Sequence, residues 1–222
     1  MPDKGHRRSL RDKFLKSGFE GFHDYEIVEL LLTLAQPMKD CKPMAKAALR
    51  KFGSSRAVLE ASAKELSEVK GLGPNNIFGL RLARDIARRY LAERIEGKDF
   101  LQSSQEVMDY LKVSLRDRSR EVFMVIYLNG RNQIMSMEEV FEGTLTTSVV
   151  YPREVVKQAL NHEAAALIFV HNHPSGNPQP SKDDLEITKK LKDAVSTIDV
   201  SIHDHIIIAG DETYSFADHG LI

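Results

Sequence analysis

The pattern of apolar and polar positions divides the chain into two parts with different periods. Across residues 1–95, apolar side chains recur every three or four positions, which is typical of amphipathic helices. We expect one helix capped by Asp24 and others that begin at Pro43, at the capping box of residues 62–65 and at Pro74. The apolar side chains expected to face a core are Ile27, Val28, Leu31 and Leu34, then Met44, Ala47, Ala48 and Leu49, then Leu66 and Val69, and finally Ile77, Leu80, Ala83, Ala87 and Tyr90.

Residues 92–103 are polar, and after them the pattern changes to short apolar runs rich in β-branched and aromatic side chains. Such runs, interleaved with amphipathic segments, predict a sheet covered by helices. The predicted strands are 122–128, 164–170 and 200–209, and the predicted helices are 152–161 and 182–196. We therefore expect an α+β protein of two domains, with an all-helical domain over residues 1–98 and an α/β domain over residues 99–222.

The composition is that of an ordinary globular protein, with 42% hydrophobic and 28% charged residues. No apolar run approaches the roughly 20 residues that cross a bilayer, and the first residues lack the apolar core of a signal peptide. Cys41 is the only cysteine, which excludes an internal disulfide and a cluster of thiolate metal ligands. We therefore expect a reduced, cytoplasmic protein with no membrane partner.

The net charge of −1 conceals an uneven distribution. Residues 1–98 contain 20 Lys and Arg against 13 Asp and Glu, whereas residues 99–222 contain 11 against 19. A basic first half indicates that a polyanion would bind there. The alternative is a helical surface whose charges serve only solvation.

Residues 69–74 join the last two predicted helices through a loop that contains Gly71 and Gly73. Glycine permits a tight turn, and the loop amides, with those at the start of the next helix, can then point at one phosphate oxygen. Such contacts hold nucleic acid without reading its sequence. The alternatives are a plain connector and a protein-binding module. The candidate nucleic-acid contacts are Lys70, Gly71, Leu72, Gly73, Arg81 and Arg84.

This loop resembles the helix-hairpin-helix motif of sequence-independent DNA-binding proteins. Residues 44–59 resemble the degenerate half that often accompanies that motif. The resemblance implies DNA as a partner of the first domain.

The most specific pattern is His171-Asn172-His173, which ends a predicted buried strand and is followed by a loop rich in Pro and by Asp184. Side chains two positions apart on a strand share a face, so both imidazoles can reach one ion. Ser181 is a natural N-cap for the next helix, and Asp184 in the first turn of that helix can return to the histidines as a third ligand. Two His and one carboxylate leave a fourth tetrahedral position for water, as catalytic zinc sites require. We therefore predict one zinc ion (Zn2+) per chain.

The string from His171 to Asp184, H-x-H-P-x-G-x-x-x-P-S-x-x-D, resembles the JAMM motif of MPN-domain proteins and is most similar to the bacterial RadC family. The resemblance covers essentially the whole chain, because RadC-like proteins also place a helix-hairpin-helix segment before the metal domain. It implies an MPN-like fold for residues 99–222, zinc ligation by His171, His173 and Asp184, a general acid and base in Glu121, and a donor to the developing oxyanion in Ser181. The alternatives are that Ser181 and Asp184 only cap a helix and that Glu121 is a solvated charge.

Three functions follow. JAMM relatives with all these residues are metallopeptidases, so the first is a zinc hydrolase of a peptide or isopeptide bond that a helical domain holds on DNA. The second is a zinc nuclease or other DNA-repair enzyme acting on phosphodiesters, and the third is a non-catalytic scaffold bound to DNA. Nucleobase deamination is excluded, because its H-x-E and P-C-x-x-C motifs are missing.

The remaining histidines of the second half have less specific settings. His203 and His205 repeat the spacing of two residues with no carboxylate motif after them, so we interpret them as structural or as supports of the metal ligands. His162 and His219 receive no role.

Overall fold

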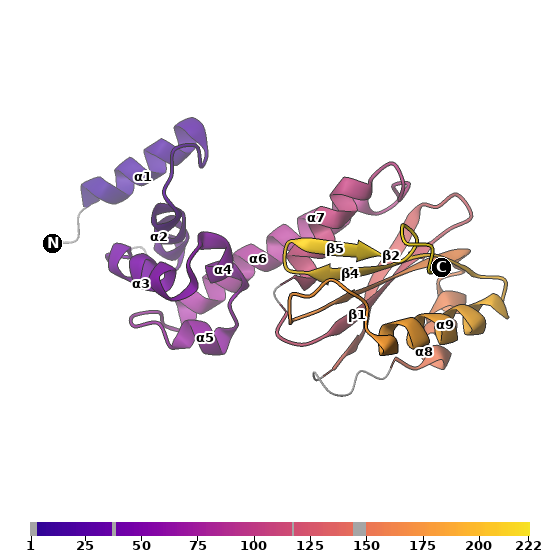
Figure 1. The fold of residues 1–222 in the computed structure, drawn as a ribbon. Helices are drawn as coiled ribbons and strands as arrows, with labels where there is room; N and C mark the ends of the chain where they lie inside the picture. The colour runs from indigo at the N-terminus through magenta and orange to yellow at the C-terminus, as the bar shows by residue number, and fades with distance from the viewer. Residues whose placement is uncertain (1–3, 37–38, 117, 144–149) are drawn as a thin grey trace. The chain divides into compact units, whose positions relative to one another are not determined.

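A computed structural model describes residues 4–36, 39–116, 118–143 and 150–222 (Figure 1). Nine helices and five strands lie within these residues, and the strands make one mixed sheet, so the prediction of an α+β chain is confirmed. The chain forms two compact units, Met1–Ala87 and Arg88–Ile222. None of the nine described helices is long and apolar enough to cross a membrane.

The first unit is helical, and its apolar core lies among five of its helices. The helices of this unit are α1 (Lys4–Ser17), α2 (Asp24–Ala35), α3 (Lys42–Phe52), α4 (Ser55–Glu60), α5 (Ala63–Ser67) and the first part of α6 (Pro74–Ile95). The core residues include Val28, Leu32, Met44, Ala48, Val58, Leu66, Leu72 and Leu80.

Three apolar side chains that we expected in a core are on the surface. Leu34 and Tyr90 are 72% and 61% exposed, and Ala87 is exposed as well. Helix α2 faces the core through Val28 and Leu32, which are one turn apart. Residue 34 therefore lies on the opposite side of that helix, because two positions correspond to about 200° of rotation.

Side chains that accept backbone amides mark the starts of helices in this unit. The N-cap of α2 is His23 and not Asp24, whose carboxylate instead accepts the amide of Ser55 at 2.9 Å. The capping box of α5 is confirmed: the hydroxyl of Ser62 accepts the amide of Glu65, and the Glu65 carboxylate accepts the amide of Ser62. Each pair satisfies amides that the helix itself leaves without partners.

The second unit is built on the mixed sheet, whose strand order is β2-β1-β3-β4-β5. The strands are β1 (Val122–Leu128), β2 (Ile134–Glu142), β3 (Ala166–Asn172), β4 (Ser201–Ala209) and β5 (Glu212–Ser215). The central strand β3 is antiparallel to β1 and parallel to β4. It begins and ends two residues later than predicted, so His171 lies inside the strand.

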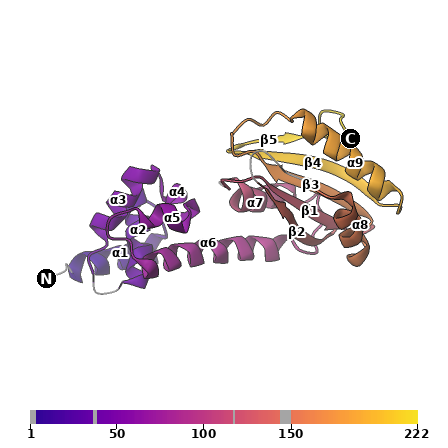
Figure 2. The ribbon, with the colours of Figure 1, turned by 90° about the horizontal axis from the view of Figure 1, so that it is seen from below.

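Both faces of the sheet are covered. Alternate residues of β1 enter two separate apolar cores, Val122 and Met124 on one face and Phe123 and Val125 on the other. Helix α7 (Ser104–Leu115) covers the first face, and α8 (Pro152–Asn161) and α9 (Lys182–Ser196) pack side by side on the second (Figures 1 and 2). The predicted helices 152–161 and 182–196 are confirmed, whereas α7, β2 and β5 had not been predicted.

The division between the two units lies within α6. Leu91, Ala92 and Ile95, from the last turns of this helix, pack in the core between the sheet and α7. These turns therefore fold with the sheet, and the division comes earlier in the chain than the boundary we expected between residues 98 and 99.

Candidate metal centre

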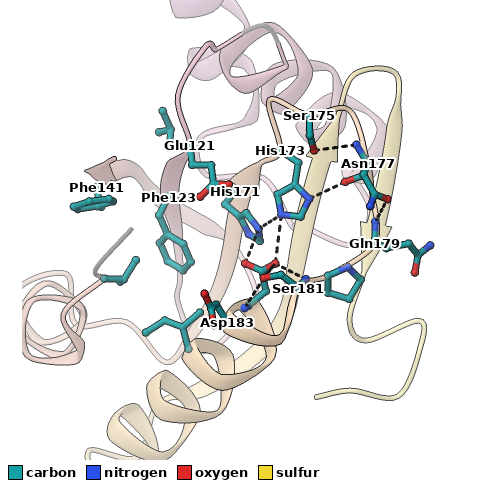
Figure 3. A pocket seen from close by; sticks show the side chains of 15 residues that line it. Glu121, Phe123, Phe141, His171, His173, Ser175, Asn177, Gln179, Ser181 and Asp183 are labelled. Carbon is teal, nitrogen blue, oxygen red and sulfur yellow. Dashed lines mark hydrogen bonds and ion pairs between the residues drawn. The ribbon is translucent and has the colours of Figure 1, made fainter. Parts of the chain in front are cut away.

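Two histidines meet at the end of the central strand. His171 is held on both sides, because it is in register with Phe123 of β1 and with Ile207 of β4. His173 follows the strand, and its amide extends the ladder by donating to the carbonyl of Ile208 at 2.9 Å. The two side chains share a face, as the alternation of a strand requires, and their Nε2 atoms are 2.9 Å apart (Figure 3).

Asp184 completes the group from the first turn of α9. Its Oδ1 lies 3.1 Å from Nε2 of His171, and its Oδ2 lies 3.4 Å from Nε2 of His173. Metal bonds of about 2.0–2.2 Å would place neighbouring tetrahedral ligands roughly 3.3–3.6 Å apart, which is within a few tenths of an ångström of these separations. Among the described residues, this is the one group of His, Cys, Asp or Glu side chains close enough to hold a metal ion.

The charges of this group favour a cation. Burial opposes ionisation of Asp184, but its contacts with His171 and His173 and its bond from Ser181 outweigh burial and hold the pKa of the carboxyl well below its usual range. Burial also opposes protonation of His173, but its bonds to Asp184 and to the Asn177 carbonyl raise the pKa of this imidazole. The site therefore presents an ionised carboxylate to whatever positive charge lies between the three side chains.

The outer nitrogen of each imidazole has a partner, which turns both Nε2 atoms inward. Nδ1 of His173 lies 2.7 Å from the carbonyl oxygen of Asn177. Nδ1 of His171 lies 2.8 Å from Nε2 of His205, a fully buried residue of β4. Burial holds the pKa of His205 well below its usual range, so this imidazole is neutral. His203, on the same strand, is exposed and bonds Asn132, so the structure separates the two histidines that the sequence pairs.

Glu121 stands directly before β1, and its side chain lies beside the two histidines (Figure 3). Its negative charge contributes to the raised pKa of His173. The backbone around it is held by Asn172, whose Oδ1 accepts the amide of Val122 at 2.8 Å and whose Nδ2 donates to the carbonyl of Arg120 at 3.0 Å. Strand alternation turns Asn172 away from the histidine face. The register of β3 with β1 brings this side chain beside Val122, at the start of β1. We did not predict a role for Asn172 from the sequence, although a polar side chain between two histidines of a buried strand indicates one.

Ser181 is the N-cap of α9, as predicted. Its hydroxyl accepts the amide of Asp184 at 3.1 Å and donates to Oδ2 of Asp184 at 2.6 Å. The backbone amide of Ser181 donates to the same oxygen at 2.7 Å. The serine therefore orients the carboxylate that faces the histidines.

The group opens into a cavity of about 480 Å³ (Figure 3). The apolar side chains that line this cavity include Phe123, Phe141, Val150 and Ile187. The acidic side chains that line it are Glu121, Asp183 and Asp184. No Lys or Arg is among the described residues that line it, so the cavity favours neutral or cationic groups over polyanions.

The candidate nucleic-acid contacts lie in the first unit, in and after the hairpin between α5 and α6. Gly71 has a φ of +96°, which explains the need for glycine there. Leu72 is buried in the core, its amide donates to the carbonyl of Val69, and the amide of Gly73 donates to Oδ1 of Asn76. These two amides are therefore paired within the first unit, with Val69 and Asn76.

The basic candidates differ in exposure. Lys70 and Arg81 are exposed. Arg84 is half-buried and donates to the carbonyl of Glu60 at 3.4 Å. Lys70 and Arg81 are therefore the candidates best placed to meet a polyanion.

Comparison with known proteins gives the chain close relatives. Residues 101–221 match the family model described as the RadC-like JAB domain. The chain is 42% identical over 212 residues to a UPF0758 protein of Nitrosomonas eutropha, covering 96% of this chain and 95% of that protein. It is 40% identical over 210 residues to a UPF0758 protein of Cellvibrio japonicus, covering 95% and 94% of the two chains.

Proposed function

Because the chain belongs to the RadC family, we propose that it is a zinc-dependent hydrolase of peptide or isopeptide bonds. The observation that carries this proposal is the convergence of Nε2 of His171, Nε2 of His173 and the Asp184 carboxylate, with Glu121 beside them in an open cavity. Three protein ligands and a free fourth position are the arrangement of catalytic zinc sites.

Each residue of the site has a distinct role in this reaction. His171, His173 and Asp184 would hold the zinc, which supplies a Lewis acid and lowers the pKa of coordinated water to about 7. Glu121 takes a proton from the attacking water and returns it to the leaving amine, a role that needs a carboxylate near the metal but outside its ligand set. The Ser181 hydroxyl lines the cavity, and its single proton, which bonds Asp184 Oδ2 in this structure, would turn to the oxyanion as it develops.

The lining of the cavity favours a peptide over a phosphodiester. The zinc would attract a phosphate, but the carboxylates of Glu121 and Asp183 would repel it, and no Lys or Arg of the described lining would add to the attraction. The apolar side, which includes Phe123 and Phe141, suits an aliphatic or aromatic side chain. Apolar lining without cationic side chains among the described residues therefore favours a peptide substrate over a nucleic acid.

Metal content is the first test. We expect one zinc per chain by elemental analysis after purification and zinc resupply. His171→Ala should lose the metal, and Glu121→Gln should keep it because the glutamate acts on water and not on the ion. A protein that takes up no transition metal would contradict the proposal.

Activity is the second test. Zinc-loaded protein is incubated separately with peptides, with isopeptide-linked peptides and with single- and double-stranded DNA, each beside the Glu121→Gln control. We expect cleavage of an amide bond that the control lacks. Cleavage of DNA alone would support the nuclease, and bound zinc with no cleavage in any arm would support the scaffold.

We propose further that the first unit holds the protein on nucleic acid through the phosphate backbone. The excess of Lys and Arg in residues 1–98 and the exposure of Lys70 and Arg81 beside the hairpin support this proposal. Because Leu72 and Gly73 use their amides internally, side-chain charge would supply the attraction.

The salt dependence of DNA binding tests the tether in the full chain. Affinity should fall steeply with salt and differ little between sequences. Lys70→Ala and Arg81→Ala should each lower the slope of log affinity against log salt by about 1. Arg153→Ala, which removes an exposed charge from the second unit, is the matched control. If all three variants had the same slope of log affinity against log salt, or if the protein bound no DNA at low salt, the hairpin would be only a connector.

A further inference from the structure

A chain of hydrogen bonds runs from His171 into α9. Nδ1 of His171 lies 2.8 Å from Nε2 of His205, and Nδ1 of His205 lies 2.6 Å from Oγ1 of Thr188. Oγ1 of Thr188 lies 2.5 Å from the carbonyl oxygen of Asp184, one turn earlier in the helix. Each end of this chain is therefore a residue of the candidate metal centre.

The carbonyl at the far end determines where every proton lies. A carbonyl oxygen only accepts, so the Thr188 hydroxyl donates to Asp184. The oxygen of that hydroxyl then accepts the proton of Nδ1 of His205. A neutral imidazole carries one proton, so Nε2 of His205 has a lone pair and accepts from Nδ1 of His171. Nε2 of His171 is left with its lone pair directed at His173 and Asp184.

The surroundings keep His205 in this state. It is fully buried, and its ring contacts the rings of Phe123, Phe169 and Phe216 at centroid distances of 5.5, 5.8 and 4.7 Å. A charged imidazolium is disfavoured in such an apolar setting. The three rings also hold the plane of the imidazole, so its two nitrogens stay aimed at His171 and Thr188.

We propose that Thr188 and His205 are positioning residues that keep the proton of His171 on Nδ1 and so prepare Nε2 to bind the metal. The proposal rests on the metal site proposed above. His173 reaches the same state more simply, because its Nδ1 donates directly to the carbonyl of Asn177. A threonine commonly bonds the carbonyl four residues earlier in a helix, so the functional part of this arrangement is the second bond, which Thr188 accepts from His205.

The near-isosteric pair Thr188→Val and Thr188→Ser tests this relay. Valine fills the same space without a hydrogen-bond acceptor, so nothing favours the proton on Nδ1 of His205. If that proton moves to Nε2 of His205, this nitrogen donates to Nδ1 of His171, and the proton of His171 moves to its Nε2. Serine retains the hydroxyl. His203→Gln is the control on β4, because His203 is exposed and lies outside the relay.

Two measurements are made on each protein. Long-range proton–nitrogen NMR of the metal-free protein, at mildly alkaline pH where imidazoles are neutral, reports which nitrogen of His171 and His205 carries the proton. Competition with a chromophoric chelator gives the zinc affinity. We expect protons on Nδ1 of both residues in the original protein, a mixture in Thr188→Val, and zinc affinity about 10- to 100-fold lower in Thr188→Val alone.

The outcomes separate the relay from the function on which it rests. A proton on Nε2 of His171 in the original metal-free protein overturns the relay, as does equal zinc affinity in the Thr188→Val and Thr188→Ser proteins. If the protein binds no zinc at all, the proposed function fails, and the NMR result still decides the relay. If Thr188→Val does not fold, the tautomers of the original protein decide it.

Discussion

Asn172→Ala should separate metal binding from catalysis. The Asn172 side chain accepts the amide of Val122 and donates to the carbonyls of Arg120 and, at 3.3 Å, Arg118. A net contribution of about 0.5–1.5 kcal/mol for each bond predicts a loss of roughly 2–4 kcal/mol in the free energy of unfolding. Domains are typically stable by about 5–15 kcal/mol, so the variant should still fold, with a melting temperature lower by roughly 10 °C.

The part of the backbone that loosens is the part that carries Glu121. General acid–base catalysis contributes about 10²- to 10⁴-fold to a rate, so a displaced carboxylate should lower turnover within that range. His171 and His173 flank residue 172, but the pairing of β3 with β1 and β4 and the bond from the His173 amide to the Ile208 carbonyl hold their backbone, so zinc content should not change. Asn172→Asp is the near-isosteric companion: it keeps an acceptor for the amide of Val122 but turns a second oxygen towards two carbonyls, so we expect an effect at least as large.

Three assays check this reasoning: elemental analysis, hydrogen exchange of the Val122 amide, and turnover on the substrate found by the activity screen. Hydrogen exchange of the Val122 amide should accelerate. Asn172→Ala should lower the turnover of the original protein but should not lower further the residual turnover of the Glu121→Gln variant, measured at high enzyme concentration. Loss of zinc from Asn172→Ala, or an equal fall in turnover in both backgrounds, would show that Asn172 does not act through Glu121.

Three further predictions concern other parts of the chain. Ser181→Ala should keep zinc, lose about 1 kcal/mol of stability with its cap, and turn over roughly a hundredfold more slowly; unchanged turnover would reduce Ser181 to a cap. Gly71→Ala should lower the melting temperature, since Gly71 has a φ of +96° and its added Cβ would lie 2.9 Å from Cγ of Met44, whereas Gly73→Ala, which meets no atom within 4 Å, should not. Zinc at 100 times its Kd should stabilise the protein by about 2.7 kcal/mol, seen as a higher melting temperature that His173→Ala abolishes.

The parts of the site that depend on contacts between residues close in the chain could be predicted from the sequence. A proline at its first position marks α8, a serine cap marks α9, and both helices lie where they were predicted. The spacing of His171 and His173 on a strand also needs no partner from elsewhere, and their imidazoles do meet. Local patterns of this kind survive folding because the contacts that make them are a few residues apart.

The parts that depend on distant partners could not be found in this way. His205 repeats the spacing of the metal histidines, and only the parallel register of β3 and β4 aims it at His171. Asn172 acts on β1, which precedes it by about fifty positions. Tyr90 fits the apolar period of α6 but is exposed. The two ends of that helix belong to different units, so one helical period cannot predict which of its side chains are buried.

Asp184 meets three independent demands. Its carboxylate faces two imidazoles and also forms the capping box with Ser181. Its main-chain carbonyl is the last acceptor in the chain of hydrogen bonds that begins at His171. Asparagine would preserve the cap without the negative charge, and glutamate would keep the charge on a longer arm that misplaces it. Every variant at this position keeps the main-chain carbonyl, but it changes the metal ligand and the cap together, so a loss of function has two sufficient causes and metal binding is tested more cleanly at His173.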